Sequence, residues 1–283
     1  MKTATISLLV LAGLLFVSSA SLPGLILGRA HAQSDGGRAV PIKSPKSLPA
    51  QPKIESGKKV YVCPPCGLDC DRQTYDKPGV CPQCGMTLVE KTGNTPMTVA
   101  ILLFNGVQII DYSGPWEVFG QAGFVVHTVA AGSGPITTVF GQKVIPDYTF
   151  QNSPKADILL IPGGSVTDAI NDSRLIEWIQ ASAKESRYVM SVCTGAFLLA
   201  KAGLLDGLSG TTIRHSLSNL ARFAPKTKVV SDRRVVDNGK IITTAGLSAG
   251  IDGALHLVSK ILGKERARAM ASGLEYKWEP DTN

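Results

Sequence analysis

The sequence predicts an α/β fold with a doubly wound, mostly parallel sheet, preceded by a small cysteine-rich zinc ribbon. Short apolar segments rich in β-branched residues alternate with helical patterns from residue 98 onward. A lone cysteine, Cys193, follows one of these segments directly before a helical pattern, whereas the other five cysteines lie between Cys63 and Cys84. Alternating strands and helices indicate a parallel sheet covered on both faces, and the crowded cysteines indicate a separate module.

The composition is that of an ordinary globular protein. The chain has 283 residues, of which 44% are hydrophobic and 18% charged, enough for one sizeable core and a small extra module. The formal net charge is +7, but the basic residues are dispersed, and Lys2 and Arg29 lie in a segment that we expect to be removed. We therefore expect no nucleic-acid partner.

The N-terminal 32 residues resemble a secretory signal peptide. Lys2 precedes an apolar run at 6–17, and Ala30-His31-Ala32 forms a small-residue cleavage site, with a second possible site at 18–20. The alternative is a membrane anchor, but the run is shorter than about 20 residues and Pro23 follows it. We expect cleavage after Ala32, no stable membrane anchor, and a periplasmic or secreted product.

Residues 33–59 are predicted to be a flexible linker. The stretch is rich in Pro, Lys, Ser and Gly and has no apolar periodicity. Such a composition buries too little apolar surface to offset the entropy of ordering.

Residues 60–92 contain two C-x-x-C turns, formed by Cys63 with Cys66 and by Cys81 with Cys84. Two facing turns of this kind supply the four thiolates of a tetrahedral zinc site, with Cys70 as a possible substitute ligand. The alternative is a set of disulfides, as in many secreted proteins. The segment resembles the heavy-metal-binding domain of bacterial metal-export proteins, but Cys66 stands where that family has histidine, which favours a closed, structural Zn²⁺ site.

The α/β domain is predicted to begin with a βα unit. Ser113-Gly114-Pro115 indicates a helix start before residues 116–122. The predicted strands before the lone cysteine are 98–104, 124–130, 136–140 and 157–161.

Residues 188–200 predict a strand, a sharp turn at Cys193 and a short helix that Gly203 stops. The pattern is that of a nucleophile elbow, in which a small residue such as Gly195 allows a strained turn. A helix N-terminus lowers the pKa of a thiol, so a thiolate is expected near neutral pH. The alternative is a buried cysteine that acts only as a small hydrophobic residue.

Residues that could assist Cys193 follow the predicted strands, including its own. Asp111 could carry a proton, and the amides of Gly163, Gly164 and Thr194 could stabilise a developing negative charge. Ligands of parallel sheets bind beyond the carboxyl ends of the strands, where all these residues are expected. Asp111 could instead cap a loop before a helix.

Five motifs together resemble the ThiJ/PfpI superfamily, which has a flavodoxin-like, class I glutamine amidotransferase-like fold, and most closely its isonitrile hydratase-like branch. The resemblance covers about residues 96–278. It implies a cysteine nucleophile, an acidic partner and a following polar residue, which fall on Cys193, Asp111 and Thr194, and it implies a homodimer without a cofactor in this domain. The motifs are Phe104-Asn105-Gly106-Val107 with Asp111 and 114–119; Ile161-Pro162-Gly163-Gly164; Cys193-Thr194-Gly195-Ala196; 203–207; and 244–252.

The chain departs from many relatives at Ile213, which follows Thr211-Thr212 where they have histidine. The departure argues against a Cys-His hydrolase, although His215 could take part, while His127 and His256 are expected to be structural. The predicted function is an exported enzyme in which a cysteine nucleophile hydrates or hydrolyses a small electrophilic substrate. The alternative is a non-catalytic redox-sensing or ligand-binding domain with a metal-binding module.

Overall fold

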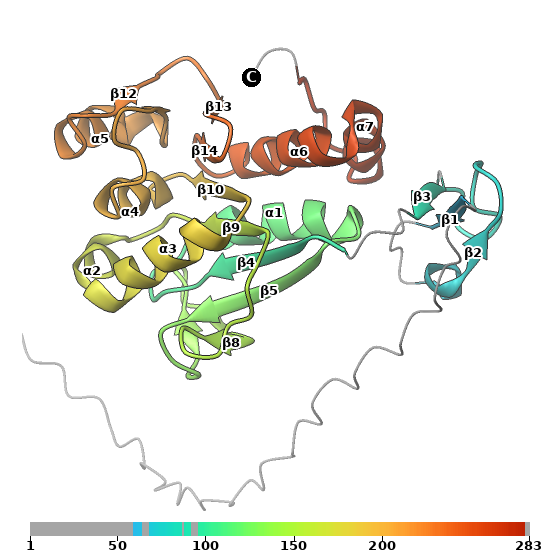
Figure 1. The fold of residues 1–283 in the computed structure, drawn as a ribbon, viewed down its shortest axis with the longest axis horizontal. Helices are drawn as coiled ribbons and strands as arrows, with labels where there is room; N and C mark the ends of the chain where they lie inside the picture. The colour runs from blue at the N-terminus through green and yellow to red at the C-terminus, as the bar shows by residue number, and fades with distance from the viewer. Residues whose placement is uncertain (1–58, 64–67, 87, 92–95, 281–283) are drawn as a thin grey trace, which may run out of the picture. The chain divides into compact units, whose positions relative to one another are not determined.

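The computed structural model describes residues 59–63, 68–86, 88–91 and 96–280, which form a small cysteine-rich module and an α/β domain (Figure 1). The predicted signal peptide and nearly all of the predicted linker lie outside the described residues. Among the helices of the described ranges, none combines the length and apolar character needed to cross a bilayer.

The module is built on a three-stranded antiparallel sheet. Strand β1 (Val60–Val62) lies between β2 (Thr74–Tyr75) and β3 (Val89–Lys91), and a 3-10 turn, η1 (Asp69–Arg72), precedes β2. Its buried hydrophobic cluster consists of three cysteines and Leu88. So few apolar side chains cannot stabilise a fold of this size alone, which favours a cross-link or a metal as the main stabilising element.

The α/β domain contains a seven-stranded sheet in the order β13-β14-β10-β9-β4-β5-β8. All neighbouring pairs are parallel except β13 with β14, which confirms the mostly parallel sheet predicted from the sequence. The strands are β4 (Thr98–Leu102), β5 (Val125–Ala130), β8 (Tyr148–Thr149), β9 (Ile158–Ile161), β10 (Tyr188–Val192), β13 (Val235–Asp237) and β14 (Ile241–Thr244).

Helices cover both faces of the sheet (Figure 1). One layer contains α1 (Ile109–Gln121), α6 (Ala249–Leu262) and α7 (Lys264–Gly273), which pack on one another. The other contains α2 (Thr167–Asn171), α3 (Ser173–Glu185), α4 (Gly195–Lys201) and α5 (Leu217–Phe223). Strands β9 and β10 are buried along their whole length, as expected for central strands enclosed on both faces.

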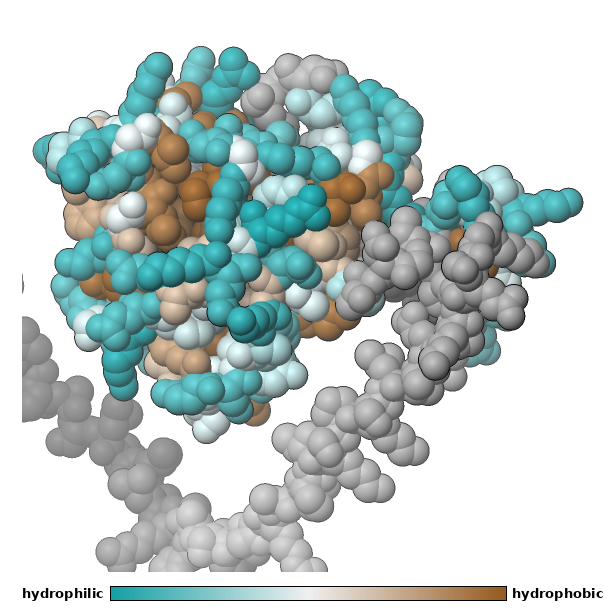
Figure 2. Space-filling view, in the orientation of Figure 1, coloured by the Kyte–Doolittle hydropathy of each residue, from teal (hydrophilic) through white to brown (hydrophobic). Residues whose placement is uncertain are grey.

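Smaller elements connect these layers. They are the hairpin of β6 (Ile136–Thr137) and β7 (Lys143–Val144), the pair β11 (Ser209–Gly210) and β12 (Lys228–Val229), and the 3-10 turn η2 (Arg214–Ser216). The visible face of the domain is mostly hydrophilic, with hydrophobic residues between the polar ones (Figure 2).

Two predictions about the first half of the domain are wrong. Residues 136–140 do not add a strand to the main sheet, because the chain turns back after Thr137 and forms the β6–β7 hairpin. Helix α1 begins at Ile109 rather than after Ser113, with Pro115 inside it. A proline has no N–H to donate to the carbonyl four residues earlier, yet the helix continues through this position, so Asp111 lies in its first turn instead of a loop.

Candidate active site and metal centre

Cys193 lies at a strained turn between β10 and α4. Its φ of 58° is in the left-handed region, which is uncommon for a residue with a side chain. The Cys193 amide donates to the Ala245 carbonyl at 3.1 Å, and the Cys193 carbonyl accepts a hydrogen bond of 2.7 Å from Thr212 Oγ1. These contacts hold the turn in place, and the strand, turn and helix agree with the predicted elbow.

Gly195 allows this turn to approach the neighbouring strand. A Cβ atom at position 195 would lie 2.2 Å from the carbonyl oxygen of Ile161, a distance that no side chain can occupy. The glycine is therefore required by space, as the elbow pattern predicts.

Asp111 projects from the first turn of α1 and is completely buried. Its Oδ2 atom accepts a hydrogen bond of 3.1 Å from the Gly163 amide, and its Oδ1 atom has no hydrogen-bond partner among the described residues. Burial raises the pKa of Asp111 to about 6, and the Gly163 amide, the nearby Cys193 thiol and the Leu247 amide oppose this rise. The carboxyl group can therefore gain or lose a proton near neutral pH.

The Cys193 thiol is 5% exposed, and its protonation differs from the prediction. Burial and the negative charge of Asp111 raise the pKa of Cys193 to about 12, although hydrogen bonds from Thr194 lower it. The expected thiolate at neutral pH is thus wrong for this structure, because desolvation and a neighbouring carboxylate outweigh the N-terminus of a seven-residue helix. At neutral pH the pair consists of a thiol and a carboxylate.

All three predicted oxyanion amides already have partners. The Gly163 amide donates to Asp111, and the Gly164 amide donates to Thr194 Oγ1 at 2.8 Å. The same hydroxyl donates to the Gly164 carbonyl at 2.9 Å. The backbone amide of Thr194 instead donates toward the Cys193 sulfur. These contacts bind Asp111 and Thr194 to the Gly163-Gly164 turn. Stabilisation of an oxyanion by these amides stays a prediction.

The structure adds three site residues that were not singled out from the sequence. Thr212 and Ala245 bind the backbone of Cys193, and the amide of Leu247 approaches Asp111. Leu247 also has a left-handed backbone, with a φ of 57°. Ala245 and Leu247 follow β14 at the carboxyl edge of the main sheet, and Thr212 follows β11, which pairs with β12 outside that sheet. Thr212 and the loop 245–248 belong to segments that carry the family resemblance. Their position directly after strands was the sequence signal that could have identified them as site residues.

The histidines of the described residues do not join this group. Ile213, which stands in place of the histidine of many relatives, packs against Gly246. His215 is exposed in η2. His127 is buried in β5, and His256 in α6 binds Asp237 at 2.8 Å, so both have structural surroundings as expected.

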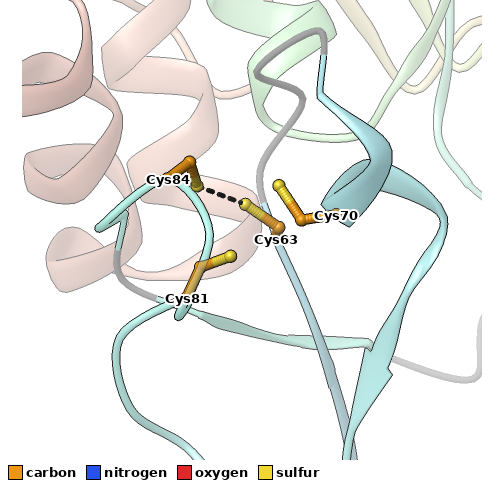
Figure 3. A group of neighbouring side chains, drawn as sticks. All are labelled: Cys63, Cys70, Cys81 and Cys84. Carbon is orange, nitrogen blue, oxygen red and sulfur yellow. Dashed lines mark hydrogen bonds between the residues drawn. The ribbon is translucent and has the colours of Figure 1, made fainter.

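The second candidate site is a group of four cysteines in the module (Figure 3). Cys63 follows β1, Cys70 lies in η1, and Cys81 and Cys84 lie in one turn, so that the four sulfur atoms are all within 4.8 Å of one another. The Sγ atoms of Cys63 and Cys84 lie 3.1 Å apart. Cys70, predicted as a substitute, is therefore part of the group, while the predicted ligand Cys66 lies outside the described residues.

The four sulfur atoms fit a metal ion. A tetrahedral zinc site has metal–sulfur distances of about 2.3 Å, which place the sulfurs about 3.8 Å apart. None of the described cysteines forms a disulfide. The hydroxyl of Tyr75 contacts Cys81 Sγ at 3.4 Å and lowers the pKa of that thiol to about 6, as a hydrogen bond to a thiolate does. The donor set indicates a metal site, and four thiolates suit zinc and softer metals alike.

Comparison with known proteins assigns both parts of the chain. The family model of the DJ-1/PfpI family matches residues 97–260, and that of the heavy metal binding domain matches residues 60–91. Isonitrile hydratase from Pseudomonas putida is 35% identical over 189 residues, which cover 65% of this chain and 80% of that protein. The transcriptional regulator GbdR of Pseudomonas aeruginosa is 25% identical over 67% of this chain and 53% of its own length.

Solved structures show the same fold. A ThiJ/PfpI family protein from Pseudomonas syringae superposes with a TM-score of 0.60 and 29% identity, covering 67% of this chain and 78% of that one. DJ-1beta of Drosophila melanogaster gives a TM-score of 0.59 at 22% identity, over 65% of this chain and all of its own. The relatives thus include an enzyme, regulators and DJ-1 proteins that share one domain.

Proposed function

Because the α/β part of the chain belongs to the DJ-1/PfpI family, we propose that it is an enzyme in which Cys193 attacks a small electrophilic molecule, in the manner of the isonitrile hydratase that it resembles. The observation that carries this proposal is the buried Asp111 beside Cys193, with one carboxylate oxygen that lacks a hydrogen-bond partner among the described residues. A buried acceptor without a partner is unfavourable for folding, and a proton transfer at that oxygen gives it a role.

The pair can activate the thiol without a histidine. The pKa of Asp111 is about 6, so the group is mostly a carboxylate at pH 7 and accepts a proton while the sulfur forms a bond. The raised pKa of Cys193 keeps the resting group a thiol, so sulfur becomes nucleophilic only as its proton moves to Asp111. The strained elbow holds the sulfur in one position throughout.

For an isonitrile, the balanced reaction has two steps. The Cys193 sulfur bonds to the terminal carbon, and the thiol proton passes through Asp111 to that carbon, which gives a thioimidate. Water then adds to the same carbon with Asp111 again transferring the proton, the carbon–sulfur bond breaks, and an N-substituted formamide leaves as the thiol is restored. One water is consumed and no redox partner is needed.

The test is formamide production from simple alkyl isonitriles by the purified full chain. Cys193→Ala should abolish turnover, and Asp111→Asn should reduce it by roughly 100-fold or more, the usual contribution of a positioned acid–base group. Thr227→Val, which removes a buried hydroxyl bonded to Leu205, is a matched control that should retain activity. Turnover that survives in Cys193→Ala would refute the proposal.

The second candidate is a redox-sensing or ligand-binding domain. The low exposure of Cys193 and the raised pKa of its thiol favour the ligand-binding form of this candidate, since both slow attack on a substrate and oxidation by a peroxide that arrives from solvent. In the redox-sensing form, a peroxide oxidises the Cys193 sulfur to a sulfenic acid and is itself reduced to water. Mass spectrometry after peroxide treatment, with no turnover on isonitriles, would select this function over the enzyme.

For the module we propose a structural Zn²⁺ bound by four thiolates. The support is the four-sulfur geometry and the small core of the module. Metal analysis of the purified protein should give close to one zinc per chain, and a different metal, or none, would contradict it.

Export and self-association are also proposals. The basic and apolar pattern of residues 1–32 supports cleavage of a signal peptide, and mass spectrometry of the protein from a bacterial periplasm should give a chain that begins at Gln33. The family resemblance supports a homodimer, which sedimentation at several concentrations would reveal.

A further inference from the structure

The loop 245–248, between β14 and α6, joins the two reacting residues. The carbonyl of Ala245 accepts the hydrogen bond of the Cys193 amide, and the amide of Leu247 approaches the Asp111 carboxylate. The position of this loop therefore affects both members of the pair at once. Neither contact involves a side chain of the loop, so the loop acts through its backbone conformation.

Two polar side chains from outside the loop contact it, and Asp252 links them. Arg234, directly before β13, donates from Nε to Asp252 at 2.7 Å and from Nη2 to Ser248 Oγ at 3.2 Å. Tyr276 donates to Asp252 Oδ1 at 3.1 Å and also lies 3.5 Å from the Ser248 carbonyl. The Asp252 side chain is only 6% exposed and forms an ion pair with Arg234, so loss of either partner leaves a buried polar group without a bond. We call Arg234, Asp252 and Tyr276 the clamp.

Residues with a strained backbone lie at the active site, in the loop and next to the clamp. Only three non-glycine residues among the described ranges have a left-handed φ: Cys193, Leu247 and Glu275. The first is the nucleophile, the second lies in the loop, and the third directly precedes Tyr276 of the clamp. Strained residues persist only where surrounding contacts enforce them, and they concentrate at functional sites.

We propose that Arg234, Asp252 and Tyr276 are positioning residues that hold the loop 245–248, in which Leu247 has a left-handed backbone, and thereby align Asp111 with Cys193. Ala245 is fixed from the same side, because its amide donates to the Arg234 carbonyl at 2.8 Å. The clamp touches no reacting atom, so its effect reaches Cys193 only through the loop. This inference rests on the proposed reactivity of Cys193.

The test measures Cys193 alkylation by iodoacetamide against pH in the full metal-bound chain, with the Cys193 peptide quantified by mass spectrometry. In the wild type the rate should rise through about pH 6 as Asp111 ionises and can accept the thiol proton. Tyr276→Phe and Asp252→Asn should loosen the loop and move the Leu247 amide away from Asp111. Because this amide stabilises the carboxylate form of Asp111, its withdrawal should raise the pKa of that group. The midpoint should rise by roughly half a pH unit, which is roughly a threefold change in the ionised fraction below the midpoint.

Matched controls remove similar groups that do not contact the loop. Asp237→Asn breaks the ion pairs of another aspartate with Lys260 and His256, and Tyr148→Phe removes a hydroxyl from the edge strand β8. Both should keep the wild-type midpoint. The titratable groups that the contacts above bring together are Asp111, Cys193, Arg234, Asp252 and Tyr276.

The outcomes separate this inference from the proposed function. An unchanged midpoint in both clamp variants, or an equal shift in the controls, would overturn the clamp. A wild-type rate with no rise near pH 6 would instead show that Asp111 does not activate Cys193, which removes the basis of the proposed function itself. Tyr276→Phe deletes a single oxygen, so it provides a readout even where Asp252→Asn fails to fold.

Discussion

At the scale of single residues, the reacting pair works against the stability of the fold. Asp111 is completely buried, and burial raises its pKa from 3.8 to about 6. A carboxyl group with a raised pKa in the folded state stabilises the fold while protonated, and that contribution is lost as the pH rises from about 4 to about 6. At pH 7 the buried carboxylate of Asp111 therefore lowers the stability of the fold relative to its protonated form.

Asp111→Asn should reveal this effect in the free energy of unfolding. Two pKa units correspond to about 3 kcal/mol, so the stability of the variant relative to the wild type should increase by about 3 kcal/mol between pH 4 and pH 7. Urea unfolding at the two pH values measures the difference. Asn has no titrating group, so a difference that is equal at both pH values would mean that Asp111 has an ordinary pKa in the folded protein.

At the scale of elements, the elbow depends on a close approach of α4 to the loop after β9. The approach leaves no room for a side chain at position 195, and Gly164, with a φ of 133°, likewise lies against the Gly106 carbonyl. Backbone atoms meet here without side chains between them, so the turn cannot relax by a change of rotamer.

Gly195→Ala should destabilise the α/β domain by at least about 2 kcal/mol, because the methyl group would overlap the Ile161 carbonyl oxygen and the backbone would have to move. The midpoint of thermal unfolding measures this loss. Gly132→Ala is the matched control, since a Cβ at the exposed Gly132 meets no atom within 4 Å and should leave the midpoint nearly unchanged. Equal midpoints for the two variants would contradict the packing seen at the elbow.

The cysteine module gives a second test at this scale. Because the four-sulfur group contains Cys70, Cys70→Ser should remove one ligand and weaken metal binding by roughly tenfold or more. Cys66→Ser is the matched variant and should retain the metal. Metal content after dialysis against a weak chelator distinguishes the two. Loss of metal in Cys66→Ser alone would restore the ligand set predicted from the two C-x-x-C turns.

At the scale of the whole molecule, the two parts are expected to be stable for different reasons. The α/β domain has a large buried core of aliphatic strands, whereas the buried cluster of the module has four members among the described residues. Removal of the metal should therefore affect the module and leave the domain folded.

A shortened chain that begins at Thr95 should fold independently. Its thermal unfolding should coincide with the main transition of the full chain. A strong chelator should not shift the transition of the shortened chain, because no ligand of the four-sulfur group remains in it. The chelator should also leave the main transition of the full chain in place, because that transition belongs to the α/β domain. Calorimetry of both chains with and without the chelator checks this expectation. A shortened chain that is unfolded under conditions where the full chain is stable would show that the two parts are not independent.

Much of the fold could be predicted because local pattern and tertiary role coincide. The apolar, β-branched segments that became β4, β5, β9 and β10 are strands in the structure, since only a doubly covered sheet can bury them on both faces. The start of α1 could not be predicted, because Ser113 and Pro115 are typical of a helix start and the packing of α1 against α6 overrides that preference.

The sequence alone determined the fold class, the elbow at Cys193 and the presence of a thiolate cluster, because spacing and composition are sufficient for each. The family was indicated by the resemblance of five motifs. Only the tertiary structure decided that Asp111 is buried beside Cys193, that the thiol keeps its proton, that Cys70 joins the four-sulfur group, and that Thr212 and Leu247 belong to the site. Burial and the distance between charges depend on how distant segments pack, and these two quantities govern a pKa. No local pattern in the chain contains them.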